Sequence, residues 1–248
     1  MSFHLQLDSV LHFRSVDSTN LEAQRQRETY TGQNVLYIAD EQTKGKGQHG
    51  RAWESAANLG LWASLFISKP GSLRHDLSLL SHYVGVIIQG SIFHLGEIQP
   101  SLKWPNDIML GSKKCGGILT EVQWSGHDIQ SAIIGFGINL RHEEMDFSPE
   151  LRRFSTSLLQ EHAAIDRDVL AEEITTRFFE QIHLLNKPEE LLAKWNAQAW
   201  KLNEVVQWQQ GNTAVTGIFQ GVTREGHARI LVGSNIETFA SGEIRWMN

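Results

Sequence analysis

Leu59-Gly60-Leu61-Trp62-Ala63-Ser64-Leu65-Phe66-Ile67 is almost entirely apolar, at odd and even positions alike, and Pro70-Gly71 follows it. A strand with one face in water alternates apolar and polar residues, so this run predicts a strand buried on both faces. Such a strand needs a covering layer, and residues 77–95 carry apolar side chains at helical spacing. We therefore expect a sheet with a core-packed helix against it.

The remaining predicted elements surround this strand without strict alternation. Asp17-Ser18-Thr19-Asn20 places cap-type residues ahead of a polar helical run, so a helix is expected to begin near Asn20. Further strands are predicted at 34–39, around 102–104, at 117–123 and at 132–140, and a long helix is predicted over 169–200. This mixture favours an α+β fold with a mixed sheet over a doubly wound parallel sheet.

The pattern changes after Asn203. Short strand-like pieces at 205–208, 213–219, 228–232 and 236–239 are separated by turns that contain glycine. This spacing is typical of a small β-barrel-like module. We predict a larger domain over residues 1–201 and a small β domain over residues 202–248.

Composition narrows the classes of partner and the compartment. The formal net charge of −6 argues against general attraction to nucleic acid or to an anionic membrane. The single cysteine, Cys115, excludes an internal disulfide and fits a reducing compartment. The first residues lack the basic and apolar stretches of a signal peptide, so a cytoplasmic location is expected. The eleven histidines show no metal-binding spacing, and no metal ligand can be named.

A glycine-rich basic loop covers Gln42-Thr43-Lys44-Gly45-Lys46-Gly47-Gln48-His49-Gly50-Arg51. Its glycines permit close backbone approach and its cations attract anions. It lacks the P-loop pattern, and although it matches Gly-x-Gly-x-x-Gly, it runs into the strand at 59–67 with little room for the helix of a dinucleotide site. The residues alone leave a mobile surface turn and a phosphate site as alternatives.

A second candidate is a hairpin around Gly111-Ser112. Asp107 and Lys114 lie seven residues apart across that turn, so pairing of the flanking strands would bring a carboxylate and an ammonium together. The pair is either an ordinary surface salt bridge or part of a pocket mouth, and nothing in the hairpin itself decides between them.

Taken together, the motifs closely resemble those of the biotin protein ligase family, from about Leu11 onward. They are Ser18-Thr19-Asn20, Gln42 with the loop ending Gly50-Arg51-x-Trp53, Lys103-Trp104-Pro105-Asn106-Asp107, Lys114-x-Gly116-Gly117-Ile118-Leu119 and Gly135-Phe136-Gly137-Ile138-Asn139-Leu140. The stretch Ser241-Gly242-Glu243-Ile244 resembles the SH3-like domain of that family. The resemblance implies an enzyme that forms biotinyl-AMP and pyrophosphate from biotin and ATP with Mg²⁺. It then transfers biotin to a lysine of a biotin carboxyl carrier protein or domain, such as that of acetyl-CoA carboxylase.

The resemblance also implies roles for individual residues. Lys114, Arg51 and Asp107 are expected to be catalytic: Lys114 at the biotin carboxylate and the forming acyl phosphate, Arg51 with Lys46 at phosphate oxygens, and Asp107 at the attacking lysine. Asp107 or Asn106 would assist Mg²⁺, which the phosphates chiefly hold. The expected ligand-binding residues are Ser18, Thr19, Asn20, Gln42, Gly45, Lys46, Gly47, Gln48, Gly50, Arg51, Trp53, Asn106, Lys114, Gly116, Gly117, Leu119, Gly135, Gly137 and Asn139.

Physical chemistry makes these assignments reasonable. Thr19, Asn20 and Gln42 offer the donors and acceptors that a buried ureido ring needs. Ser18 is either a helix cap or a ligand contact, and Trp53 is either an apolar wall or core packing. Paired glycines at 116–117 would let backbone approach the biotin tail. The turn at 135–137 and Asn139 would face the adenosine.

One departure from the family concerns the glycine-rich loop. Many bacterial members carry additional arginines there, whereas this sequence has Gln48 and His49 after Lys46. Fewer fixed charges would then cover the adenylate, so weaker retention of biotinyl-AMP is predicted.

Three other functions remain as alternatives. A DNA-binding repressor is disfavoured because only about ten residues precede the first motif and no basic face is evident. A lipoate or octanoate transferase is disfavoured by the absence of an Arg-Arg-x-x-Gly-Gly-Gly stretch. A non-catalytic biotin-binding module would leave Arg51 and Lys114 without a purpose. The expected partner is the carrier domain, without nucleic acid or membrane, and a homodimer is left open.

Overall fold

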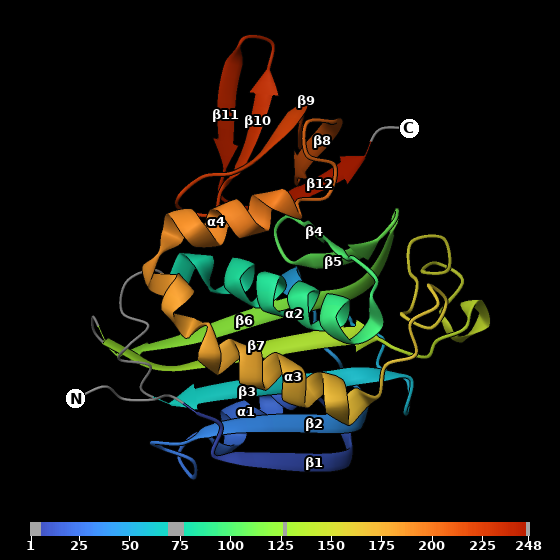
Figure 1. Ribbon diagram of the computed structural model, residues 1–248, viewed down its shortest axis with the longest axis vertical. Helices are drawn as coiled ribbons and strands as arrows, with labels where there is room; N and C mark the ends of the chain where they lie inside the picture. Colours follow the sequence, from blue (N-terminus) through green and yellow to red (C-terminus); the bar gives the residue numbers. More distant parts are fainter. Residues whose placement is uncertain (1–5, 69–76, 126–127, 247–248) are drawn as a thin grey trace.

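The computed structural model describes residues 6–68, 77–125 and 128–246. Its centre is a seven-stranded mixed sheet with the order β1-β2-β3-β7-β6-β5-β4, which confirms the predicted α+β fold (Figure 1). β1 and β2 are parallel, and the other neighbours are antiparallel. The strands are β1 (Ser9–Val16), β2 (Asn34–Gln42), β3 (Gly60–Ser68), β4 (Ser101–Lys103), β5 (Asp107–Leu110), β6 (Lys113–Ser125) and β7 (Asp128–Asn139).

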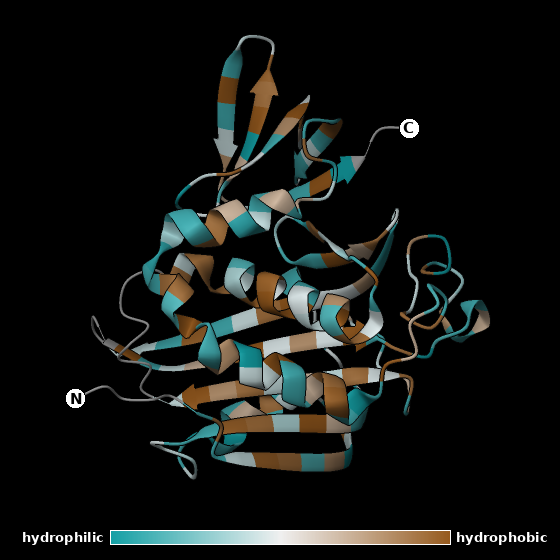
Figure 2. Cartoon of the chain, viewed as in Figure 1, coloured by the Kyte–Doolittle hydropathy of each residue, from teal (hydrophilic) through white to brown (hydrophobic). Residues whose placement is uncertain are grey.

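The run that was predicted to be buried on both faces is β3. Leu61, Leu65 and Ile67 belong to the main apolar core, which also contains residues of α2 (Leu80–Gly96), α3 (Arg167–Glu180) and α4 (Pro188–Ala197). Phe66 points to the opposite face, where it packs in a smaller cluster with Ala23 of α1 (Thr19–Gln26). Figure 2 shows the hydrophobic residues concentrated along the central strands. Pro70 and Gly71, expected to close the strand, lie outside the described residues.

The predicted core helix is confirmed, with a short 3₁₀ turn (Leu77–Leu79) ahead of α2. The segment Leu77–Gly96 is long and apolar enough to cross a bilayer, with a mean hydropathy of 1.2. In this structure 67% of an apolar 18-residue stretch of this segment is buried inside the protein, where the helix packs on the sheet and on α3 and α4. Its apolar composition is therefore accounted for by the core.

The predicted single helix over 169–200 is wrong. The chain forms α3, a 3₁₀ segment (Ile182–Asn186) and then α4, and the break falls at Lys187, which has φ −130°. Pro188 is the first residue of α4. Proline has no amide hydrogen to donate and disfavours helical geometry in the residue before it, so it can start a helix but cannot continue one.

A five-stranded antiparallel sheet follows, with the order β11-β10-β9-β8-β12. Its strands are β8 (Val205–Gln210), β9 (Thr213–Val222), β10 (Ala228–Val232), β11 (Asn235–Phe239) and β12 (Glu243–Trp246), the last of which was not predicted. It stands beside α4 at the top of Figure 1. The indole nitrogen of Trp104 donates to the Gly226 carbonyl at 2.9 Å, and the Val222 amide donates to Asn196 Oδ1 of α4 at 3.0 Å. These bonds join the small sheet to the larger layer, and the domain boundary at 201/202 stays a prediction.

His82 of α2 lies buried at this junction. Its ring packs against Trp195 with 5.2 Å between centroids, and a Cβ on Gly226 would come within 2.7 Å of its Cε1. Neither ring nitrogen has a hydrogen-bond partner in the described part of the chain. Burial, and secondarily repulsion from His227, lowers the pKa of His82 to about 4. The folded protein therefore holds this histidine neutral.

The free energy of unfolding should decrease as the pH falls from about 6.5, the usual pKa of histidine, towards 4. In that window the unfolded chain binds a proton at this position and the folded chain does not. The contribution approaches roughly 3 kcal/mol at the acid end. His82→Leu should remove it in urea titrations at several pH values, whereas the exposed control His183→Leu should not. An unchanged pH slope in His82→Leu would contradict the prediction.

Candidate active site

A cavity of about 630 Å³ brings the sequence-predicted residues together from both sheets. Of those predictions, the residues that line it are Ser18, Thr19, Asn20, Gln42, Lys46, Gly47, Gln48, Arg51, Trp53, Asn106, Asp107, Lys114, Gly117, Leu119, Gly135, Gly137 and Asn139. Gly45, Gly50 and Gly116 are not among its lining residues. Gly45 packs against the Trp53 carbonyl, Gly50 makes a turn at φ +74°, and Gly116 faces Ile108 and the Gly137 carbonyl.

Glycines form the floor of the cavity. Gly117 of β6 pairs with Gly137 of β7, and Gly135, which pairs with Leu119, lies two residues before Gly137 in β7. A Cβ on Gly135 would lie 2.1 Å from Asn20 Oδ1, and one on Gly137 would lie 2.6 Å from Trp53 Nε1. Both side chains can therefore rest directly on the backbone of the sheet.

The approach of the biotin tail to the glycine pair at 116–117 stays a prediction, and the structure shows a further role for Gly117. A Cβ on Gly117 would lie 3.1 Å from the Trp53 ring and 3.3 Å from Lys114 Cε, so this glycine makes room for those two side chains. The Trp53 ring also meets Trp62 edge-on at 6.4 Å between centroids. Trp53 thus both lines the cavity and packs on the core, which joins the two alternatives left open by the sequence.

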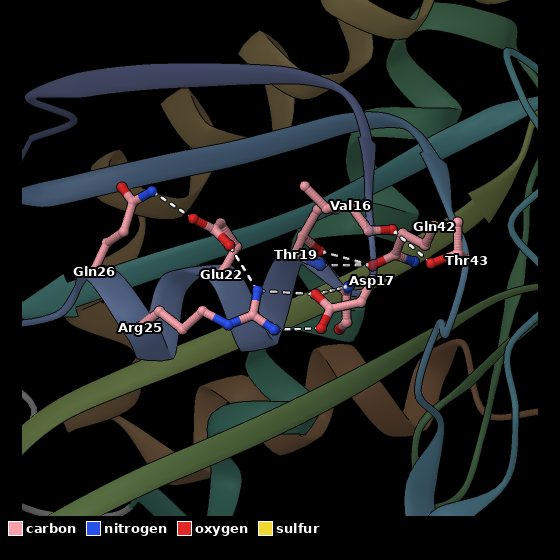
Figure 3. Close-up of polar contacts among 9 residues, drawn as sticks. Val16, Asp17, Thr19, Glu22, Arg25, Gln26, Gln42 and Thr43 are labelled. Carbon is pink, nitrogen blue, oxygen red and sulfur yellow. Dashed lines mark hydrogen bonds and ion pairs between the residues drawn. The ribbon is translucent and has the colours of Figure 1, made fainter.

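The start of α1 is fixed beside the end of β2 (Figure 3). Gln42 Oε1 accepts from the Thr19 amide at 2.8 Å and lies 3.1 Å from the Thr19 hydroxyl, while Gln42 Nε2 donates to Ser55 at 2.8 Å. The Asp17 carboxylate binds Arg25, which also binds Glu22. Ser18 occupies the N-cap position, but its side chain makes no capping hydrogen bond.

Asn20 continues this polar row across the sheet. Its Nδ2 donates to Glu121 Oε2 at 2.7 Å, and its Oδ1 lies 2.5 Å from the Ser64 hydroxyl, which is itself 2.7 Å from the Thr19 hydroxyl. Sequence analysis did not identify Ser64, Glu121 or Ser55. The β3–β7–β6 pairing brings Ser64 and Glu121 to Asn20 from 44 and 101 residues away, and no local pattern signals such a contact.

The predicted hairpin is formed by β5 and β6, and its ion pair faces the cavity. Lys114 Nζ lies 2.5 Å from Asp107 Oδ1 and 5.1 Å from the centroid of the Trp53 ring, and Lys103 Nζ is 3.7 Å from Asp107. Of the two hypotheses for this pair, the structure agrees with a pair at the mouth of a pocket and not with an ordinary surface salt bridge. The Lys114 amide donates to the Phe154 carbonyl at 2.7 Å, which anchors the lysine's backbone.

The glycine-rich loop is an ordered turn that folds back on itself. The Gly47 amide donates to the Arg51 carbonyl at 2.7 Å, and the Trp53 amide donates to the Gly45 carbonyl at 2.9 Å. His49 takes φ +57° at the tip. The loop therefore presents Lys46 and Arg51 at the cavity without the helix of a dinucleotide site.

The small sheet contributes to the same cavity through Gln209, Gln210, Gly242, Glu243 and Arg245. Glu243 Oε2 accepts from Arg51 Nη2 at 3.1 Å. Burial of the Glu243 carboxyl favours its neutral form, but Lys103, Arg51 and Arg245 outweigh this effect and hold its pKa below the ordinary value. Sequence analysis noted Glu243 only within a domain resemblance, because the approach of the two sheets has no sequence signal.

A third part of the wall comes from the segment after β7, through Phe147, Leu151 and Ser155, which were also missed. Asn139 Nδ2 donates to the Thr156 carbonyl at 3.0 Å and so ties this segment to the end of β7. The described residues contain no group of three His, Cys, Asp or Glu side chains that could hold a metal ion. The site therefore offers local cations, polar groups and apolar walls.

The model of the biotin/lipoate A/B protein ligase family matches residues 12–139, which are 128 of the 248 residues. This chain belongs to that family. A bifunctional ligase/repressor BirA from Bacillus spizizenii is 35% identical over 164 residues, which are 66% of this chain and 50% of the relative. The chain thus spans about half the length of that relative.

Two further members of the family cover more of the chain. A biotin--(acetyl-CoA-carboxylase) ligase from Mycobacterium tuberculosis is 27% identical over 216 residues, which are 85% of this chain and 78% of the relative. The solved biotin protein ligase from Aquifex aeolicus, in complex with biotin and ATP, is 28% identical with a TM-score of 0.80. It covers 96% of this chain and 98% of its own, so both sheets are shared with that member.

Proposed function

We propose that this protein is an ATP-dependent biotin protein ligase. It forms biotinyl-5'-AMP and pyrophosphate from biotin and ATP, and it then transfers biotin to a lysine of a carrier protein. The observation that carries the proposal is the convergence of Lys114 and Arg51, from different elements, with the Thr19–Gln42 polar row in one cavity. The Aquifex ligase with biotin and ATP, alike over almost the whole chain, supports it.

The first step joins two anions. A carboxylate oxygen of biotin attacks the α-phosphorus of ATP, and pyrophosphate leaves. Lys114, held at the cavity by Asp107, offsets the charge that builds between the two groups, and Arg51 and Lys46 hold phosphate oxygens. The Arg51 side chain is 66% exposed, so its pair with Glu243 is a weak one that phosphate can replace.

In the second step the carrier's lysine attacks the biotinyl carbonyl, and AMP leaves. A protonated amine has no free electron pair, so the attacking group must lose a proton. Asp107 is the carboxylate proposed for this task, and its position in the cavity beside Lys114 supports the proposal. It accepts the proton or orients the amine for attack.

Mg²⁺ is proposed to enter with ATP and to be held chiefly by phosphate oxygens. Asp107, which is paired with Lys114 and Lys103, or Asn106, which donates its amide nitrogen to the Ile118 carbonyl at 2.6 Å, would assist through a side-chain oxygen. The donor set is thus that of a site for a metal carried by its nucleotide. The ion would neutralise the leaving pyrophosphate.

The polar row favours biotin over lipoate. A ureido ring has one carbonyl and two N–H groups, which match the side chains of Thr19, Asn20 and Gln42. The dithiolane ring of lipoate has no such groups, so it would leave these atoms unpaired at about 1–3 kcal/mol each. The Asp107–Lys114 pair and the glycine-rich loop would serve either acid equally.

The partner is proposed to be the biotin carboxyl carrier domain of acetyl-CoA carboxylase or a related enzyme, as the name of the Mycobacterium relative suggests. The net charge of −6 supports the expectation that neither nucleic acid nor a membrane is a partner. A cytoplasmic location belongs to the same proposal. A homodimer stays a prediction.

Biotin should support exchange of labelled pyrophosphate into ATP, and lipoate should not. Lys114→Gln should reduce this exchange by about 100-fold or more, because a fixed charge that stabilises the developing anion is lost. Lys113→Gln, the preceding residue, which does not line the cavity, is the control and should retain activity. Equal exchange with lipoate would contradict the proposed substrate, and no exchange with either acid would contradict the enzyme.

Asp107→Asn should slow transfer of biotin from preformed biotinyl-AMP to the carrier by about 10²–10⁴-fold. The reason is that the amide cannot accept a proton from the attacking amine. Single-turnover transfer from labelled biotinyl-AMP separates this step from adenylate formation. A rate equal to that of the wild type would remove Asp107 from the second step.

Gln48→Arg should slow the dissociation of labelled biotinyl-AMP, because Gln48 lines the cavity and the change adds a cation where the loop has few. Gln33→Arg adds the same charge at an exposed position outside the cavity and should leave dissociation unchanged. Equal release from Gln48→Arg and the wild type would refute weak retention by this loop.

A further inference from the structure

The polar row on the cavity floor ends at a carboxylate. Glu121 of β6, half-buried, accepts from Asn20 Nδ2, and the row continues through Ser64 and Thr19 to Gln42. Ser64 is fully buried, and Thr19 and Asn20 are nearly so. Buried hydroxyl and amide groups are costly to leave unpaired, so the donors and acceptors of this row must agree with one another.

The carboxylate at one end determines the direction of the row. An ionised carboxylate can only accept, so Asn20 must turn its amide nitrogen to Glu121 and its oxygen to Ser64. The single hydroxyl hydrogen of Ser64 is then directed to Asn20 Oδ1, 2.5 Å away. Gly135 leaves room for this amide, because Asn20 Oδ1 lies 2.1 Å from the place where a Cβ would stand.

The consequence reaches Thr19. Its hydroxyl is 2.7 Å from Ser64 and donates to Gln42 Oε1 at 3.1 Å. Because the Ser64 hydrogen is directed to Asn20, the Thr19 oxygen keeps its lone pairs for the cavity. Gln42 Oε1 also accepts from the Thr19 backbone amide at 2.8 Å, so both of its lone pairs are used. Gln42 Nε2 donates one hydrogen to Ser55 and has a second. The cavity therefore presents an acceptor at Thr19 and a donor at Gln42.

We propose that Glu121 is a positioning residue that selects a neutral ureido ring by fixing the direction of this hydrogen-bond row. The proposal rests on the proposed function and deepens it. A ureido ring offers N–H groups to the Thr19 acceptor and a carbonyl to the Gln42 donor. A cationic guanidino ring of the same shape replaces that carbonyl with an N–H donor, which then meets the donor on Gln42.

Glu121→Gln is the variant that tests this role. Glutamine keeps the size of the side chain but can donate or accept, so Asn20 can flip and the row can reverse. We expect KM for biotin in pyrophosphate exchange to rise roughly tenfold, with KM for ATP and kcat nearly unchanged. The preference for biotin over 2-iminobiotin, the guanidino analogue, should fall by a similar factor at a pH where that group is charged.

A second variant separates direction from structure. In Asn20→Asp combined with Glu121→Gln, the residue at 20 can only accept, so Ser64 still donates to it and Thr19 stays an acceptor. The double variant should recover the preference for biotin over the guanidino analogue relative to Glu121→Gln alone. Asn20→Asp alone sets two carboxylates against each other and should bind biotin far worse than the double variant.

Glu41→Gln, which removes a carboxylate outside the cavity, is the matched control and should change neither quantity. An unchanged preference in Glu121→Gln, or a preference that the double variant does not recover, would overturn the proposal. A lower kcat together with higher KM values for both substrates, and an unchanged preference for biotin, would show a merely structural role for Glu121. That result would overturn the proposal too. Pyrophosphate exchange by the wild-type protein tests the proposed function separately, because it depends only on whether biotin supports the exchange.

Discussion

The bare backbone of β6 and β7 is the constraint on which the site depends. Gly117, Gly135 and Gly137 have no side chains where these strands face the cavity, so Asn20 and Trp53 lie directly on the sheet. Any Cβ at 135 or 137 would occupy space that a functional side chain already fills. The depth of the cavity, the polar row and the indole wall all follow from this flat surface.

The cavity is a product of two sheets. Arg51 of the glycine-rich loop reaches Glu243 of β12, and Trp104 beside β4 donates to the Gly226 carbonyl between β9 and β10. The small sheet thus holds both the cationic loop and the hairpin that carries Asp107. The small sheet therefore both lines the cavity and supports the segments around it. The buried His82 shows how closely the two layers pack.

Local charge matters more here than the overall balance. The chain is acidic, yet Lys114, Lys46 and Arg51 line one cavity, and Asp107 and Glu243 pair with Lys114 and Arg51. Carboxylates that pair with cations in this way keep them ordered until a stronger anion arrives. A phosphate offers more acceptor oxygens than either carboxylate, so exchange of partners is favourable. An acidic protein can therefore bind a nucleotide.

The sequence by itself determined the mixed sheet, the core helix and the β5–β6 hairpin, and through the family resemblance of its motifs it identified half of the residues that line the cavity. These follow from periodicity, turn residues and contiguous motifs such as the one from Lys103 to Asp107, which are properties of neighbours along the chain. It did not predict the break at Pro188, because the periodicity of 169–200 continues on both sides of it.

Only the tertiary structure decided that Ser64 and Glu121 orient Asn20, that Glu243 meets Arg51, and that Phe147 and Leu151 complete the wall. These contacts join residues between 44 and 192 positions apart, or segments with no regular pattern. Strand register and the docking of one sheet on another set them, and neither is encoded in any short stretch of sequence.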